Sequence, residues 1–123
     1  MARLPDEALV VRGGKNLADN FKQGTGVSLD ADGKLQGVSV NAGADMTLEQ
    51  LTAGNDQGYR GIPNSQLGQT TVGEVRKLGG DVEPKPSRWN PNHATLGGLT
   101  PEQASSLFTP TVKNPNARSR RRP

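Results

Sequence analysis

Short hydrophobic runs separated by glycine-rich and polar stretches follow one another along the chain. This pattern predicts many short elements instead of a few long ones. Residues 8–12 are mostly apolar and end at two glycines, which predicts a first strand entering a turn. Residues 27–29 and 35–40 flank the sequence Asp-Ala-Asp-Gly-Lys, a pattern typical of a β-hairpin. Further short strands are expected at residues 66–69, 81–83 and 93–96.

Three expected helix starts share one signature, a threonine three residues before a glutamate or glutamine. It occurs at Thr47, Thr71 and Thr100. At this spacing each side chain can hydrogen-bond to the backbone amide of the other residue, which stabilises the first turn. A fourth short helix is expected at residues 16–22, with Asn16 as its N-cap. A hydrophobic content of only 31% would also fit a disordered chain, but these orderly local signals favour a folded one.

The sum of these elements is a single α+β domain. We expect a small antiparallel sheet of four to six short strands with three or four short helices. Residues 1–7 should lead into the fold, residues 8–112 should form the catalytic domain, and residues 113–123 should be a basic flexible tail.

Charge is unevenly distributed between the tail and the body of the domain. Five positive charges fall in the tail, on Lys113, Arg118, Arg120, Arg121 and Arg122. Subtracting these five from the total of +3 leaves −2 on residues 1–112, so the body is not a basic nucleic-acid-binding surface. The tail can bind phosphates without sequence preference, or it is a solvated chain end.

Several classes of protein are excluded by what the sequence lacks. No cysteine is present, which excludes a disulfide framework and a thiolate zinc site. No apolar run approaches the roughly 18 residues of a membrane span, and no signal-peptide pattern opens the chain. We therefore expect a domain that works in a reducing cytosol without contacting a membrane.

His93 is the only histidine and the leading candidate for acid–base catalysis, because imidazole titrates near neutral pH. It follows a loop rich in proline and asparagine and opens an expected strand. Thr95 lies two residues further on and would project from the same face. One histidine without cysteine cannot build a zinc site, so no metal or other cofactor is expected. The alternative is a surface or structural histidine.

Arg12 ends the first expected strand and is followed by two glycines and Lys15. Glycines let backbone amides approach a phosphate closely, and arginine offers it a planar fork. The Gly-Lys-Ser/Thr ending of a nucleotide-binding P-loop is missing. A strand end with a tight turn explains the same residues equally well.

Five further residues are weaker candidates. Thr71 is expected to cap a helix, and Thr70 to present a hydroxyl at that helix N-terminus, where anions bind. Arg88 and Trp89 lie in a loop, where they can stack on a base or pack on the core. Thr109 follows the last expected helix, as a substrate-binding residue or simply as the end of the helix.

Several sequence blocks, taken in order, resemble the C-terminal toxin domains of contact-dependent-inhibition and Rhs-type bacterial proteins. They are Val-Val-Arg-Gly-Gly at 10–14, Gly-Val-Ser-Val-Asn at 37–41, and residues 62–76, 91–104 and 107–116. The resemblance implies a toxin that is secreted as part of a larger protein and delivered into the cytoplasm of a target bacterium. It also implies a cognate immunity protein.

Within that group the chain resembles small metal-independent ribonucleases of the barnase, EndoU and colicin type. The resemblance implies a monomeric endoribonuclease that cleaves RNA, typically tRNA, and leaves a 2′,3′-cyclic phosphate. The catalytic set of those enzymes is a histidine, a lysine or arginine, and serine or threonine hydroxyls. In this sequence it corresponds to His93, Thr95, Arg12 or Lys15, and more weakly to Thr70 and Thr109.

Two other functions stay open. In an ADP-ribosyltransferase toxin the first strand also ends in Arg-Gly, which Arg12 and Gly13 match. Ser39 would correspond to the serine on the second strand of such an enzyme. Such enzymes also have a catalytic glutamate on a strand near the end of the domain. This sequence has no clear counterpart, because Glu102 sits at an expected helix start. The remaining possibility is a non-enzymatic interaction or structural module.

Overall fold

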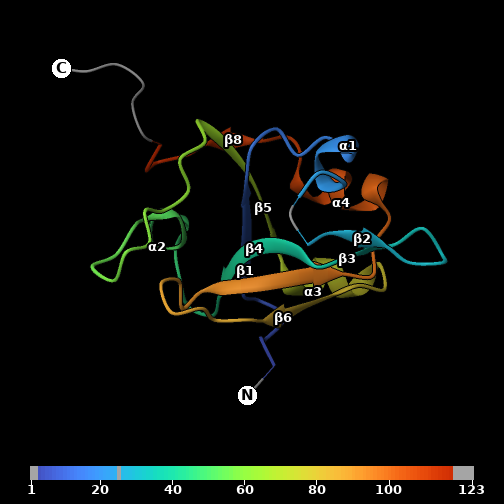
Figure 1. The fold of residues 1–123 in the computed structure, drawn as a ribbon, viewed down its shortest axis with the longest axis horizontal. Coiled ribbons are helices and arrows are strands. Elements are labelled where there is room, and N and C mark those ends of the chain that lie inside the picture. The colour runs from blue at the N-terminus through green and yellow to red at the C-terminus, as the bar shows by residue number, and fades with distance from the viewer. Residues whose placement is uncertain (1–2, 25, 118–123) are drawn as a thin grey trace.

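The structure, a computed structural model, describes residues 3–24 and 26–117 (Figure 1). In chain order its elements are β1 (Leu9–Gly13), α1 (Ala18–Phe21), β2 (Ser28–Leu29), β3 (Leu35–Gln36), β4 (Val38–Gly43), α2 (Leu48–Thr52), β5 (Gln66–Thr71), α3 (Val72–Lys77), β6 (Asp81–Pro84), β7 (His93–Gly97), α4 (Pro101–Phe108) and β8 (Val112–Lys113). Six of these strands form one antiparallel sheet in the order β6-β7-β4-β1-β5-β8, and β2 and β3 form a separate pair. The expected single α+β domain is confirmed.

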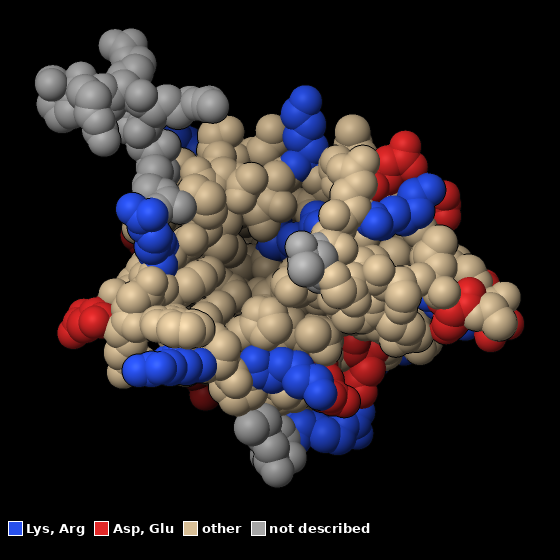
Figure 2. All heavy atoms as spheres, in the orientation of Figure 1, with Lys and Arg blue, Asp and Glu red and all other residues tan. Residues whose placement is uncertain are grey.

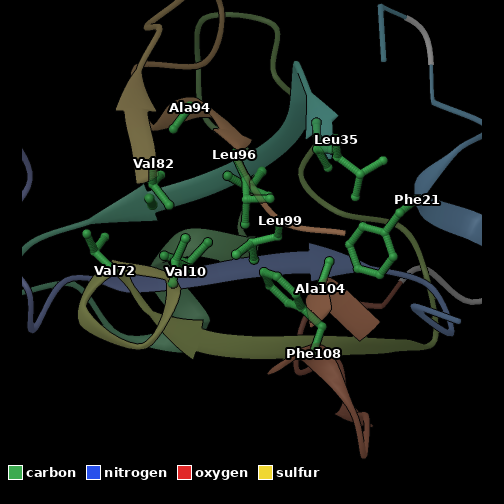
Figure 3. Close-up of a cluster of buried hydrophobic side chains, with 14 of the residues drawn as sticks. Val10, Phe21, Leu35, Val72, Val82, Ala94, Leu96, Leu99, Ala104 and Phe108 are labelled. Atoms are coloured by element: carbon green, nitrogen blue, oxygen red, sulfur yellow. The ribbon is translucent and has the colours of Figure 1, made fainter. Parts of the chain in front are cut away.

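One face of the main sheet carries the hydrophobic core, which α1, α3 and α4 cover. Figure 3 shows Val10 of β1 and Leu96 of β7 pointing toward Phe21 of α1 and Phe108 of α4. The rings of Phe21 and Phe108 are completely buried, with centroids 5.8 Å apart. Burying such a ring stabilises the fold by about 1.5–3 kcal/mol. The two phenylalanines thus hold α1 and α4 against the sheet.

The opposite face of the sheet is only partly covered, by α2 and the loop of residues 53–64 that follows it (Figure 1). Val11 and Leu67 point to this side and are fully buried with Leu51 of α2, apart from the main core. Ser39 and Thr95, on neighbouring strands, stay partly or wholly exposed. Their side of the sheet is therefore the accessible one.

The three threonine signatures begin helices as predicted. At Thr47 and Thr100 both reciprocal hydrogen bonds form. At Thr71 only one of the two hydrogen bonds forms: the threonine hydroxyl accepts from the Glu74 amide at 3.3 Å. The Glu74 carboxylate pairs with Lys77 instead, at 2.9 Å. A capping interaction competes here with an ion pair one helical turn away.

The helix predicted over residues 16–22 is shorter than expected, and Asn16 is not its N-cap. Leu17 occupies that position, and the helix covers only Ala18–Phe21. Asn16 is fully buried with φ 58°, and its side chain bonds to Arg12 and to the carbonyl of Gly14. The bonds to Arg12 keep this asparagine in the turn and out of the helix.

The hairpin predicted from residues 27–29 and 35–40 is split between two sheets. Only Leu35–Gln36 pairs with β2, and the chain then turns at Gly37, where φ is 76°. A Cβ at Gly37 would lie 2.6 Å from the carbonyl oxygen of Gly26, so a side chain does not fit there. After this turn Val38–Gly43 joins the main sheet beside β1 and β7.

The folded unit extends past residues 8–112 at both ends. Leu4 packs against the core, and Lys113 pairs with Gln66 at the sheet edge. Asn114 is 2% exposed and donates to two backbone carbonyls of the loop 53–64. The four arginines expected to make the tail basic, at 118 and 120–122, lie outside the described residues. No helix in the described ranges is long and apolar enough to cross a membrane.

Candidate active site

A cavity of about 280 Å³ opens on the accessible face of the sheet, where β1 and β4 separate. The residue pairs between these strands end at Val11 and Asn41, and the chains diverge beyond that point. The cavity is lined by Val11, Arg12, Gly13, Ser39, Val40, Asn41, Tyr59, Gly61, Ile62, Pro63, Asn64, Asn90 and His93. In the view of Figure 2 a hollow lies near the centre of the molecule, and blue basic side chains border it. None of the described residues that line the cavity is acidic.

His93 is held in one orientation by two strands. It opens β7, and its Nδ1 lies 2.9 Å from the carbonyl oxygen of Lys85, just past β6. A carbonyl oxygen only accepts, so Nδ1 of the neutral ring carries the proton and Nε2 keeps its lone pair. The amide of Lys85 donates in return to the His93 carbonyl at 2.9 Å. The ring therefore presents a proton acceptor at a fixed position.

Ser39 lies beside that acceptor. Its Oγ is 3.2 Å from Nε2 of His93, and its side chain is exposed on β4. The two strands are paired, with Ser39 opposite Thr95 and Asn41 opposite His93, so all four side chains project from one face. With the proton on Nδ1, Nε2 of His93 accepts a hydrogen bond from the Ser39 hydroxyl, so it faces a hydroxyl in this cavity.

Arg12 forms part of the cavity wall but is anchored from the far side of β1. Its guanidinium donates to Asn16 Oδ1 at 2.8 Å and to the Asn20 carbonyl at 3.3 Å, and it stacks 4.4 Å above the Phe21 ring centre. Burial lowers the pKa of Arg12. None of the ion pairs found in the described residues includes Arg12. This half-buried cation therefore lacks an acidic partner, and further N–H groups remain for an anion.

A network of amides builds the deep wall of the cavity, and sequence reasoning missed it. Asn41 is buried on β4, and its Nδ2 donates to the Leu51 carbonyl and to the Tyr59 hydroxyl, each at 2.8 Å. Its Oδ1 accepts from Nδ2 of Asn90 at 2.9 Å. The sequence offers little signal for it, because Asn41 continues the alternation of Val38, Ser39 and Val40 and is expected to be exposed like Ser39.

Thr95 projects from the same face as His93, as expected, but it lines a different cavity. That cavity has a volume of about 660 Å³ and lies along β6 and β7, with Glu83 opposite Thr95 in the strand register. Arg12 and His93 thus share one cavity, and Thr95 belongs to its neighbour. Lys15 is exposed and lies outside the wall of the His93 cavity.

The remaining threonines are not brought to the cavity. Thr70 lies opposite Val10 in the β1–β5 register and so faces the core side of the sheet. Thr71 caps α3, as described above. Thr109 ends α4, and its hydroxyl donates to the Ser105 carbonyl at 2.6 Å. Each of these positions is accounted for by local structure.

Arg88 and Trp89 lie beside Asn90, which lines the cavity. The Arg88 guanidinium sits 5.6 Å from the Trp89 ring centre, and the indole is 52% exposed. Asn55 donates to the Trp89 carbonyl at 2.8 Å, and Gly58 lies so close that a Cβ there would be 2.7 Å from the indole. The pair forms an exposed aromatic and cationic ledge next to the site.

No group of three or more His, Asp or Glu side chains that could hold a metal ion occurs in residues 3–24 and 26–117. Glu102 lies in the first turn of α4, exposed, and does not line the cavity. Comparisons of the chain with protein-family models, with curated proteins and with solved structures found no match.

Proposed function

We propose that this domain is a ribonuclease that cleaves RNA by transesterification, without a metal ion. The 2′-hydroxyl of one nucleotide attacks the adjacent phosphate, and the products are a 2′,3′-cyclic phosphate and a 5′-hydroxyl. The observation that carries the proposal is His93, whose Nε2 is held as a proton acceptor at the edge of a cavity and already bonds to a hydroxyl. A base within reach of the reacting hydroxyl is the first requirement of this reaction.

The electrostatics of the cavity suit a phosphodiester. Its described lining includes one cationic residue, Arg12, and no acidic residue, so a bound phosphate meets no competing negative side chain there. Charge that accumulates on the phosphate in the transition state is stabilised by a cation that is already in place. The anchoring of Arg12 by Asn16, Asn20 and Phe21 keeps it in position.

The ledge formed by Arg88 and Trp89 favours single-stranded RNA as the substrate. An exposed indole stacks on any base, and a neighbouring guanidinium reaches the backbone. We include in the proposal tRNA as the substrate, a toxin role in a target bacterium, and a cognate immunity protein, all of which follow from the sequence resemblance. An immunity protein that covers the cavity would block the reaction.

The test is to incubate the purified domain with total bacterial tRNA in EDTA and to separate the products on a denaturing gel. We expect discrete fragments ending in a 2′,3′-cyclic phosphate. The fragments should disappear with His93→Ala and persist with Glu102→Gln, an exposed substitution on α4 that serves as the control. Intact tRNA with the wild-type domain, or equal cleavage by His93→Ala, would refute the proposal.

A second candidate is an ADP-ribosyltransferase, which one observation favours. Arg12 and Ser39, the residues that matched this class in sequence, line the same cavity. The described lining lacks the glutamate that such an enzyme needs. The ribonuclease is therefore the better-supported of the two candidate functions. Transfer of label from labelled NAD to protein or nucleic acid would establish it. A blank result in both assays would favour a non-enzymatic module.

A further inference from the structure

Tyr59 is the only tyrosine of the chain, and its hydroxyl lies in the wall of the His93 cavity. The phenol oxygen accepts a hydrogen bond of 2.8 Å from Nδ2 of Asn41. The direction of this bond is fixed, because Asn41 Oδ1 accepts from Asn90 and Nδ2 also donates to the Leu51 carbonyl. Asn41 can only donate to Tyr59.

The hydroxyl hydrogen of Tyr59 is therefore available for another partner. Among the described residues no acceptor is found for it. The amide of Asn41 also continues to favour the phenol oxygen when that oxygen becomes negative, because an N–H donor stabilises an anion. Tyr59 is arranged to donate a proton into the cavity.

The position of Tyr59 complements that of His93. Asn41 is the cross-strand partner of His93, and the phenol bonded to Asn41 lines the same cavity as the imidazole. One group of the pair accepts a proton and the other donates one. A transesterification needs both, a base at the attacking 2′-oxygen and an acid at the departing 5′-oxygen.

The loop that carries Tyr59 is itself held firmly. Asn55 Oδ1 accepts from the Tyr59 amide at 3.1 Å, and the Asn55 amide donates to the Tyr59 carbonyl at 2.9 Å. Gly54 leaves room for this turn, since a Cβ there would lie 2.7 Å from the Tyr59 carbonyl oxygen. The phenol is thus fixed before a substrate arrives.

We propose that Tyr59 is the general acid of the reaction, an inference that rests on the proposed ribonuclease function. His93 Nε2 removes the proton of the 2′-hydroxyl, and the 2′-oxygen forms a bond to phosphorus. The bond from phosphorus to the 5′-oxygen breaks, and that oxygen takes the proton of the Tyr59 hydroxyl. Water then reprotonates the phenolate, and the imidazolium returns its proton to solvent.

The test uses two RNA substrates that differ in one atom at the bond cleaved by the wild-type domain. In one the leaving atom is the normal 5′-oxygen, and in the other it is a bridging 5′-sulfur. A thiolate leaves near neutral pH without being protonated, so it needs no general acid. We expect Tyr59→Phe to slow cleavage of the oxygen substrate by about 10²–10⁴-fold. It should cleave the sulfur substrate at nearly the wild-type rate.

The matched control is His93→Ala, which should be slow on both substrates because the attacking hydroxyl still needs a base. Tyr59→Phe that is equally slow on both substrates would overturn the acid role and leave Tyr59 a structural residue. Rescue of His93→Ala by sulfur would also overturn it, because the histidine would then be the acid. Wild-type protein that cleaves neither substrate would refute the ribonuclease function itself. The melting temperature of each variant shows that it is folded.

Discussion

At the scale of single residues, Arg12 combines two tasks that compete for one guanidinium. It ties the turn at Asn16 to β1, and it supplies the only positive charge among the described residues that line the cavity. Asn16 is completely buried, so losing Arg12 would leave its amide oxygen without a partner. Under the proposed function, a change at this position would affect both the free energy of unfolding and anion binding, so the two effects are measured separately.

We expect Arg12→Ala to lower the free energy of unfolding by about 1–3 kcal/mol, the cost of a buried polar group left unpaired. Urea unfolding measures this directly. Inorganic phosphate should raise the melting temperature of the wild-type protein, because a ligand that binds only the folded state stabilises it. It should not do so for Arg12→Ala. An equal rise in both proteins would show that phosphate binds elsewhere.

At the scale of elements, the β2–β3 hairpin depends on a single carboxylate. Asp30 Oδ1 accepts from the amides of Asp32 and Lys34 at 2.9 and 3.0 Å, and Oδ2 accepts from Gln36 at 3.1 Å. The bond from the Lys34 amide is the largest cause that lowers the pKa of Asp30. The tight turn is thus stabilised by the charged form of one exposed side chain.

The sign of the resulting pH dependence follows from that lowered pKa. A carboxyl whose pKa is lower in the folded state stabilises the fold above its unfolded pKa of about 3.9 and loses this contribution in acid. We expect the amide NMR signals of Asp32 and Lys34 to titrate with a midpoint below the ordinary aspartate range. In Asp30→Ala this transition should be absent. A midpoint at or above the ordinary range would contradict the hydrogen-bonded turn.

Elements with a local signature were the ones that the sequence predicted well. The caps at Thr47, Thr71 and Thr100 and the strand at His93 depend on neighbouring residues, and their positions are confirmed. Asn16 was misassigned because its partner, Arg12, is fixed by the tertiary fold.

The cavity was harder to foresee, because its wall comes from four distant parts of the chain. Pairing β4 with both β1 and β7 brings Ser39 beside His93, and no local pattern contains that register. The place of Tyr59 in the cavity wall could not be predicted either, since it depends on a bond to Asn41 18 residues earlier.

At the scale of the whole molecule, the two parts of the segment after residue 112 should behave differently. Residues 113–117 belong to the fold, with Asn114 buried and Asn116 bonded to the Glu49 carbonyl and the Thr52 hydroxyl. Removing residues 118–123 takes away four arginines. That truncation should weaken RNA binding and flatten its salt dependence. Unchanged binding would show that the arginines do not contact RNA.

The matched truncation, which removes residues 113–123, should lower the melting temperature as well. It eliminates the side chain of Asn114, which donates to the carbonyls of Ile62 and Asn64 at 2.8 Å each. Equal melting temperatures for the two truncated proteins would contradict the structural role of residues 113–117.

The two asparagines at 114 and 116 also determine when the cavity can exist during folding. They bind α2 and the loop 53–64, the loop that carries Tyr59, from positions 50 to 67 residues later in the chain. Contacts between such distant positions form late, because closing a long loop costs entropy before any bond is made. A chain still being synthesised lacks these hydrogen bonds until residue 116 has emerged. The cavity is thus assembled among the last parts of the molecule, and the proposed RNA-cleaving activity would appear only after residue 116 has joined the fold.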